Sequence, residues 1–589
     1  MTRLRSISFG FGAMLCASAA YLSYPAPADS AVGRVAAAEE PGFEQTPPVL
    51  EDSFITPVDD HPDGNALLEF TYVKGQDLPA EIPFNVGDKP VKLQRDEQNP
   101  QLYRAMIPFD FDGLIKEQEL RQALATEEKA TVPSFDGREH LGDSPISFLP
   151  PDKLREQIAA RTRIRIPGGV LLGPPAIVRP ERSLLVTHPA VVEDPTRTFD
   201  ACTNAGNPNG AWTFNRLMTN MANQPLTGVD PSDFVENWIR TWNTSTTVNS
   251  FVVPARTSVN SQVLASWPRL SNGKLDLARS PMRLLAIVNR VDLRGNAGYG
   301  GGNAGEGRFV FGVIRRNATG SCTVHRFTVI LEYGVPINGC PAVRSFAQQW
   351  GALGSMSLGS SLYNSSLQAI TDQFTGANAA PRKPNGSAIN QIRTNEFLQS
   401  PWELREFNIV RATAQLGIVP AKQTPNHVFN NAGTLLASYV NANQAQVLVE
   451  QHSVPLSYLG TPFLTGSVRN PSPQVAWTHP GIVNNNARNK LSLNTCDACH
   501  GRETLTTSFL HVGPRSSGAQ ATLSRFLIGN GTLASPTTFN MADPVVGSTV
   551  RNYGDMVRRQ ADLATLQSNA CLSGGVFQQA QFQPMLATH

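Results

Sequence analysis

The sequence predicts a multidomain α+β protein with a small β-rich N-terminal domain, a central α+β domain and a mostly helical C-terminal domain. Three observations support this fold class. The chain has 589 residues, a length typical of roughly three or four domains. Runs of β-branched and aromatic residues alternate with stretches in which apolar residues recur every three or four positions. A proline- and glycine-rich segment, residues 166–180, marks a domain boundary.

Composition excludes two broad classes of protein. The chain has 49 basic and 47 acidic residues, a formal charge of +2, whereas a general nucleic-acid binder is more basic. It has seven cysteines, too few for a disulfide scaffold of this length. Each cysteine therefore needs an explanation from its own position.

The N-terminus has the pattern of a cleavable export signal. Arg3 and Arg5 precede an apolar run, residues 7–20, that is too short to span a bilayer. Ala26 and Ala28 then form a small-residue cleavage site. We therefore predict a signal peptide over residues 1–28, a periplasmic or extracellular location and no transmembrane segment. Cleavage would remove two basic residues and no acidic one, so the mature chain would be nearly neutral.

The segment after the signal divides into a linker and a small domain. Residues 29–63 hold nine acidic residues and a single arginine, which predicts a disordered acidic linker. Residues 64–150 are predicted to form the small β-rich domain, because short β-compatible runs alternate with turn residues. These runs cover residues 66–73, 90–93 and 102–108, and a charged helical pattern follows over 116–129.

The central α+β domain is predicted over residues 183–470. Apolar residues spaced as in amphipathic helices occur over residues 214–221 and 233–242. Runs rich in β-branched and aromatic residues predict strands over 283–291, 308–314 and 327–333. Downstream, helical patterns at 487–501, 519–528 and 551–567 predict a small helical domain over residues 475–589.

The helical domain contains the sequence Cys496-Asp497-Ala498-Cys499-His500. On a helix, residues i and i+3 share a face, so both thiols would point the same way and the histidine would follow on the next turn. The pattern C-x-x-C-H is the attachment motif of c-type haem. An export signal in the same chain strengthens this interpretation, because haem is attached covalently outside the cytoplasm.

The last 115 or so residues resemble a single-haem class I cytochrome c domain. The resemblance rests on the C-D-A-C-H motif, a following helix, a methionine in a loop and a closing helix. It implies that Cys496 and Cys499 bind one haem c covalently, that His500 is the proximal iron ligand, and that the domain transfers electrons. The residues flanking the motif are also similar to exported proteobacterial proteins of unassigned role.

The sixth ligand of the iron has three candidates. Met541 lies 41 residues after His500, before the closing helix, which is where the class I family places its distal methionine. His511, 11 residues after His500, is the alternative. An open or water-bound iron is the third, and it would favour catalysis or ligand sensing.

Two other interpretations of the motif remain open. Cys496, Cys499 and His500 could contribute to a zinc or iron–sulfur site, although no second ligand pair with regular spacing lies nearby. The two cysteines could also form a redox pair, although the flanks lack a βαβ pattern. Among the remaining mature cysteines we expect disulfides Cys322–Cys340, which flank one strand, and by elimination Cys202–Cys571.

These patterns predict an exported c-type haem protein that acts in electron transfer or as the redox centre of an oxidoreductase. Its redox partner would be another protein or a small-molecule electron donor or acceptor, and nucleic acid is not expected. One alternative is a surface binding or adhesion-type protein with an accessory haem. Another is a hydrolase in the central domain that uses Glu306 and Glu332 as a carboxylate pair.

Overall fold

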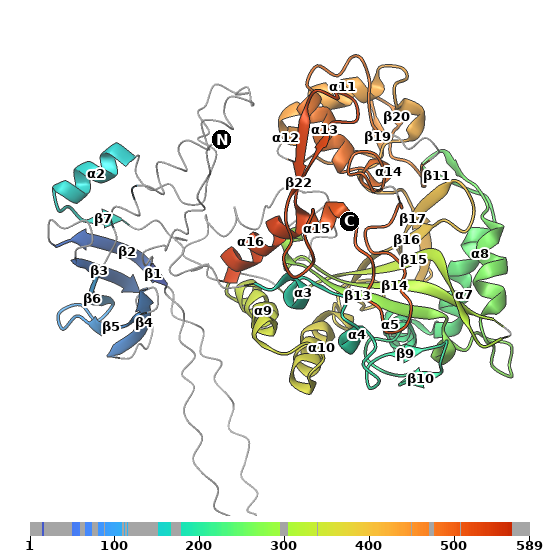
Figure 1. Ribbon diagram of the computed structural model, residues 1–589, viewed down its shortest axis with the longest axis horizontal. Helices are drawn as coiled ribbons and strands as arrows, with labels where there is room; N and C mark the ends of the chain where they lie inside the picture. Colours follow the sequence, from blue (N-terminus) through green and yellow to red (C-terminus); the bar gives the residue numbers. More distant parts are fainter. Residues whose placement is uncertain are drawn as a thin grey trace, which may run out of the picture. The chain divides into compact units, whose positions relative to one another are not determined.

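The structure is a computed structural model, and most of what it describes lies between residues 178 and 567 (Figure 1). The described residues are 15–16, 50–58, 65–72, 80–86, 89–108, 111, 115, 151–165 and 178–567 except 295–303, 318, 338–339, 449, 451, 471–475 and 507. The chain divides into two compact units, Met1–Ala176 with Ser568–Ala580, and Ile177–Gln567 with Gln581–His589. The predicted signal peptide lies almost entirely outside the described residues.

The first unit contains a seven-stranded antiparallel sheet. Its strand order is β1-β4-β5-β6-β3-β2-β7, and Leu68, Phe70, Tyr103 and Ile107 form part of its buried core. The elements are β1 (Leu15–Cys16), β2 (Leu50–Pro57), β3 (Asn65–Tyr72), β4 (Glu81–Val86), β5 (Lys89–Arg95), β6 (Leu102–Pro108), α2 (Pro151–Ala159) and β7 (Ile164–Arg165).

These elements confirm the three strands predicted for the small domain. Strand β2 lies inside the segment predicted as an acidic linker. It pairs with β3 along its length and with β7 at Phe54 and Ile55. The helix predicted over residues 116–129 lies outside the described residues.

The second unit is built on an eight-stranded sheet whose strands all pair antiparallel. The order is β18-β17-β16-β15-β14-β13-β8, and β21 pairs with the free part of β17. The strands are β8 (Leu185–Val186), β13 (Met282–Arg290), β14 (Glu306–Arg316), β15 (Cys322–Gly334), β16 (Ile389–Glu396), β17 (Trp402–Val410), β18 (Gln415–Val419) and β21 (Val468–Asn470). The three strands predicted for this region are confirmed.

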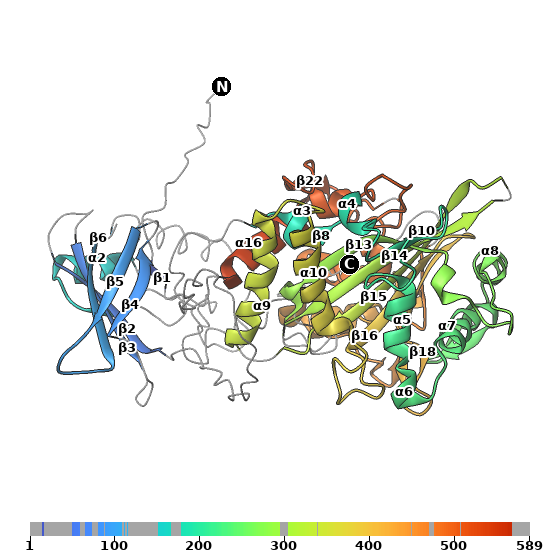
Figure 2. The ribbon, with the colours of Figure 1, turned by 90° about the horizontal axis from the view of Figure 1, so that it is seen from below.

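One face of this sheet is apolar and packs against the helices α5 (Phe214–Ala222), α7 (Pro231–Arg240) and α10 (Ser361–Thr375) (Figure 2). Aromatic rings meet across the contact, with 5.5 Å between the ring centroids of Phe214 and Phe311. Gly307 lets α10 approach closely, because a Cβ there would stand 2.1 Å from the ring of Phe374. Helices α5 and α7 confirm the two amphipathic helices predicted from sequence.

The other face carries charged side chains among its apolar ones. The Arg308 guanidinium lies 3.4 Å from the Glu332 carboxylate across β14 and β15, and Arg393 on β16 lies 3.3 Å from the same carboxylate. All three residues are buried. Buried charges are tolerated only when they are paired, so this face needs both a matching network and a cover.

The C-terminal segment, residues 476–567, supplies that cover. Arg515 donates from Nη2 to the backbone oxygen of Leu284 on β13 at 2.8 Å, and Arg558 pairs with Asp292 at 3.0 Å. Its elements are α13 (Asn485–Leu493), α14 (Cys496–Cys499), α15 (Arg525–Ile528), β22 (Phe539–Ala542), β23 (Val550–Tyr553) and α16 (Asp555–Gln567).

The predicted fold class is therefore wrong in its C-terminal part. Residues 475–589 do not form a mostly helical, cytochrome c-like domain: the described part is a set of short helices and one hairpin, packed on the large sheet. Within the predicted helix 519–528, only the single turn α15 is helical. The chain before it is extended, and Val512 forms a β-bridge with Leu523. The apolar spacing in these stretches reflects burial against the sheet and not a separate helical core.

The remaining elements of the second unit are short helices and hairpins around these layers. They are α3 (Pro180–Ser183), α4 (Pro189–Val192), β9 (Phe199–Asp200), β10 (Ala205–Gly206), α6 (Gln224–Thr227), β11 (Thr246–Val248), β12 (Phe251–Val253), α8 (Thr257–Gln262), α9 (Cys340–Ala352), α11 (Leu435–Ala442), α12 (Gln444–Leu448), β19 (Ser457–Tyr458) and β20 (Thr461–Pro462). No helix within the described residues is long and apolar enough to cross a membrane.

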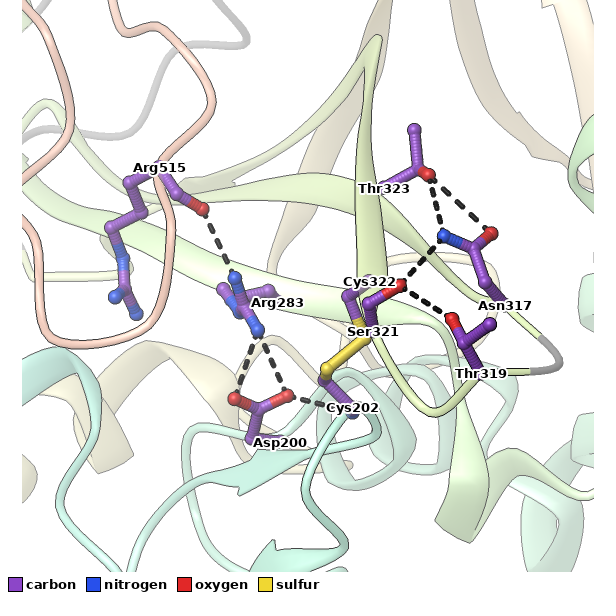
Figure 3. The surroundings of a disulfide bond; sticks show 9 residues. All are labelled: Asp200, Cys202, Arg283, Asn317, Thr319, Ser321, Cys322, Thr323 and Arg515. Carbon is purple, nitrogen blue, oxygen red and sulfur yellow. Dashed lines mark hydrogen bonds and ion pairs between the residues drawn. A yellow bond between two sulfur atoms is a disulfide. The ribbon is translucent and has the colours of Figure 1, made fainter.

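A disulfide joins Cys202 to Cys322, beside the ion pair of Asp200 and Arg283 (Figure 3). The predicted pair Cys322–Cys340 is wrong, because Cys322 begins β15 and Cys340 follows its far end. A strand of 13 residues is roughly 40 Å long, and a disulfide requires Cα atoms within about 7 Å. The predicted pair Cys202–Cys571 is excluded by the bond to Cys322, and Cys571 lies outside the described residues.

Candidate functional site

The C-x-x-C-H motif forms the one-turn helix α14, which is held from several sides. The backbone N–H of Cys496 donates to Oγ1 of Thr424 at 3.0 Å. Asp497, between the two cysteines, accepts a hydrogen bond from the indole Nε1 of Trp477 at 2.8 Å. Asn470 donates from Nδ2 to the Asp497 backbone oxygen at 2.7 Å. These bonds fix the position of a helix too short to be stable alone.

Both cysteines of the motif are buried, free thiols. Burial raises the pKa of Cys496 to about 12 and raises that of Cys499 well above its ordinary value. The thiols are therefore protonated at neutral pH. Redox-active cysteine pairs depend on a thiolate with a lowered pKa, so this environment does not favour the dithiol interpretation of the motif.

His500 is buried at the end of α14 and is oriented by its surroundings. Its Nδ1 lies 2.8 Å from the backbone oxygen of Phe509, which can only accept, so Nδ1 carries the proton. The ring stacks on Trp402 with 5.3 Å between centroids and 24° between planes. Burial lowers the pKa of His500 to about 4, so the imidazole is neutral. A neutral imidazole whose Nδ1–H is bound to a carbonyl presents the Nε2 lone pair that a metal ion binds.

His500 lines a cavity between the C-terminal segment and the polar face of the sheet. The cavity has a volume of about 40 Å³, enough for roughly three water molecules. Its walls are largely apolar. The lining residues are Leu185, Val288, Arg290, Arg308, Val310, Thr328, Ile330 and Asn395 from the sheet, and His500, Leu510, His511, Val512, Leu527 and Arg559 from the C-terminal segment.

The structure brings together some of the predicted site residues and not others. Cys499 Sγ lies 3.4 Å from Nε2 of His511, and the rings of His500 and His511 lie 4.5 Å apart at their centroids. Met541 is buried on β22 opposite Arg551 and does not line the cavity. The sixth iron ligand remains a prediction.

The spacing of the two histidines does not correspond to a pair on opposite sides of one metal ion. With metal–nitrogen bonds of about 2 Å, two such rings would have centroids roughly 6 Å apart. Within the part of the chain that the structure describes, no three His, Cys, Asp or Glu side chains form a group that could hold a metal ion.

Glu306 and Glu332, the predicted carboxylate pair, lie in one network and share a cation. Arg308 lies 2.6 Å from Glu306 and 3.4 Å from Glu332, and Gln391 donates to Glu332 at 2.5 Å. Burial acts to raise the pKa of Glu332, but Arg308 and Arg393 outweigh it and lower the pKa. An ionised, ion-paired carboxylate has no proton to donate, so this geometry does not favour the acid role in glycoside hydrolysis.

The sequence analysis missed the contribution of the central sheet to this site. Arg290 and Arg308 are buried in β13 and β14, where most of the buried side chains are apolar, and Trp402 begins β17 against the motif. A charged residue in a buried apolar strand is rare without a partner or a function, and that signal was available in the sequence. The sequence did not indicate which segment of the chain would cover these arginines.

Searches of protein-family models, curated proteins and solved structures found no match to the chain.

Proposed function

We propose that this chain is a c-type haem protein in which Cys496 and Cys499 hold one haem through thioether bonds and His500 is the proximal iron ligand. The observation that carries the proposal is the state of His500. Its imidazole is buried and neutral, and the Phe509 carbonyl fixes the proton on Nδ1. The two free thiols of α14, which directly precedes His500, complete the residues that covalent attachment needs.

The chemistry of the residues around His500 fits a haem. Apolar side chains from both layers line the cavity, and three arginines are among the lining residues. The thioether carbons would come from the two vinyl groups, with each S–H proton passing to the neighbouring carbon. When bound, the haem supplies a one-electron redox couple, which supports a role in electron transfer or as the redox centre of an oxidoreductase.

The size of the cavity sets a condition on this proposal. A volume of about 40 Å³ is too small for a porphyrin. The C-terminal segment must therefore lie further from the sheet when the cofactor is bound. We expect attachment to precede the packing of this segment against the sheet.

The disulfide supports the predicted export. Disulfides persist in oxidising compartments, and haem c is attached in the same kind of compartment. We therefore infer that the chain acts in the periplasm or outside the cell. Its redox partner is a protein or a small-molecule electron donor or acceptor.

The test is expression of the full chain with its own signal in a bacterium that attaches haem c. We expect the purified, denatured protein to retain one haem, seen as the ferrous absorption band in alkaline pyridine. Cys496→Ser together with Cys499→Ser should abolish this retention, whereas the control Cys340→Ser should not. Denatured wild-type protein without bound haem would overturn the proposal. Carbon monoxide binding by the native ferrous protein would separate an open iron from one with six protein-derived ligands.

A further inference from the structure

Residues 512–523 form a loop, here called the cover loop, whose base lies against the C-x-x-C-H motif. At this base the backbone N–H of Ser524 donates to the backbone oxygen of His511 at 2.9 Å. His511 in turn contacts the motif, with 3.4 Å from its Nε2 to Cys499 Sγ and 4.5 Å between its ring centroid and that of His500. A displacement of the cover loop would therefore displace a residue that shields Cys499.

Arg515 fastens the cover loop to the large sheet. Strand β13 pairs with β14 along its length, whereas β8 pairs with it only at Ile287 and Val288. Leu284 lies before this short pairing, and its backbone oxygen accepts hydrogen bonds from Nε and Nη2 of Arg515 at 3.1 and 2.8 Å. The Glu193 carboxylate pairs with Nη1 of the same guanidinium. The buried Arg515 side chain thus holds the loop on β13.

Arg283 connects the cover loop to the disulfide (Figure 3). Its Nη1 donates to the backbone oxygen of Arg515 at 3.1 Å, and its Nη2 lies 3.1 and 2.9 Å from the two carboxylate oxygens of Asp200. The backbone N–H of Cys202 donates to the same carboxylate at 2.8 Å. Arg283 is 4 % exposed, so a shift of Asp200 would take a counter-charge away from a buried guanidinium, which is costly.

The disulfide anchors the hairpin that carries Asp200 and Cys202. Strands β9 and β10 have two residues each and β10 is exposed, and so short a hairpin is not stable by itself. The bond to Cys322 ties it to the start of β15. Both half-cystines are partly exposed, whereas Cys496 and Cys499 are fully buried. A reductant in solution can therefore reach the disulfide but not the motif thiols.

We propose that the Cys202–Cys322 disulfide is a redox latch that controls access to the C-x-x-C-H motif. A dithiol reductant opens it by thiol–disulfide exchange: the reductant gives up two electrons and two protons, forms its own disulfide and leaves two thiols on this chain. The hairpin then loses its covalent anchor, Asp200 no longer holds Arg283 in place, and the cover loop moves away from Cys499. This inference goes beyond the proposed function, because it concerns access to the thiols whatever molecule binds them.

The test measures how fast the motif thiols of the native full chain react with N-ethylmaleimide. The chain is exported in a host that attaches no haem c, and peptide mapping reports each cysteine separately. We expect Cys202→Ser together with Cys322→Ser to raise the alkylation rate of Cys499 roughly tenfold or more over the oxidised wild type, because local opening becomes more frequent. Wild type treated with a dithiol should react as fast as this double variant.

Two further variants separate the latch from a general loss of stability. Arg515→Gln breaks the attachment to β13 while the disulfide stays intact, so it should also speed the alkylation of Cys499. Leu367→Ala is the matched control. Leu367 is buried in α10, on the opposite face of the sheet, so its truncation destabilises the fold without touching the latch. This variant should react at close to the wild-type rate.

Equal alkylation rates in the oxidised wild type and the double serine variant would overturn the latch. Acceleration of the same size by Leu367→Ala would also overturn it, because exposure of the thiols would then follow unfolding of the whole unit. The rates are measured on protein without haem, so they test the latch independently of the proposed function.

Discussion

At the level of single residues, Trp402 connects the sheet to the C-x-x-C-H motif. Its ring stacks on the ring of His500 and also on the ring of Phe509, with 5.7 Å between the centroids of Trp402 and Phe509. It also packs in a core cluster with Leu404 and Cys496. Since Phe509 supplies the carbonyl that fixes the His500 ring, Trp402 supports both the imidazole and its hydrogen-bond partner.

We predict that Trp402→Ala lowers the free energy of unfolding by about 3–5 kcal/mol, as expected for truncation of a fully buried aromatic side chain. Trp402→Phe is the control: it keeps a stacking ring, loses an indole N–H that makes no hydrogen bond in the described part of the chain, and leaves a smaller void than alanine does. It should cost much less. Urea denaturation measures both, and equal losses would show that the stacking contributes little.

His452 sets a pH dependence of stability. It is buried, neither ring nitrogen has a hydrogen-bond partner among the described residues, and burial lowers its pKa to about 4. Because the unfolded chain binds the proton more tightly, with a pKa near 6.5, stability falls as the pH drops from about 7 towards 4. This residue alone should contribute a loss of about 3 kcal/mol over that interval.

His452→Gln should therefore flatten the acid side of the stability profile by about that amount, with no change in slope above pH 7. His479→Gln, at a partly exposed ring, controls for the general effect of removing an imidazole. Denaturant midpoints between pH 4 and 8 provide the measurement. An unchanged slope in the His452 variant would show that another group controls acid sensitivity.

At the level of elements, the strands could be predicted from the sequence. The packing of the C-terminal segment over them could not. The runs in β13, β14 and β15 are rich in β-branched and aromatic residues, a local property that one sequence displays. The short helix α14 is fixed by hydrogen bonds to Thr424, 72 residues before Cys496, and to Trp477, 20 residues before Asp497. The helical spacing of this region could therefore not distinguish a separate domain from a segment that covers the sheet.

The disulfide is a second feature that sequence position did not predict, and its contribution to stability can be tested. Sequence position favoured a local pair, whereas the folded chain brings the turn after β9 to the start of β15, across 120 residues. Cross-linking so long a loop restricts the unfolded chain strongly, so Cys202→Ser with Cys322→Ser should cost about 3–5 kcal/mol. Denaturation under non-reducing conditions measures this loss. If the double variant is as stable as wild type, the bond is absent or contributes nothing.

At the level of the whole molecule, the C-x-x-C-H motif belongs to the unit built on the large sheet. The cavity beside His500 takes lining residues from β8, β13, β14, β15 and β16 as well as from the C-terminal segment. The motif itself could be predicted from five residues, because its chemistry is local. The grouping of arginines around this cavity could not be predicted, because it depends on which segments meet in space.

A fragment of residues 475–589 should therefore not fold alone. Removed from the sheet, its apolar residues lose their partners, and the ion pairs of Arg515 and Arg558 with residues before 470 are lost. We expect no cooperative thermal transition for the fragment and a clear one for the full chain, followed by circular dichroism. A fragment that melts cooperatively would show that it is an independent domain.

Peptide mapping of the exported full-length protein tests the central claim most directly. Trypsin cleaves after Lys490 and Arg502 and releases residues 491–502, which contain the whole motif. We predict that this peptide carries the added mass of one haem and that Cys496 and Cys499 resist alkylation. A peptide of unmodified mass with both thiols alkylated would contradict the assignment of covalent haem c to this chain.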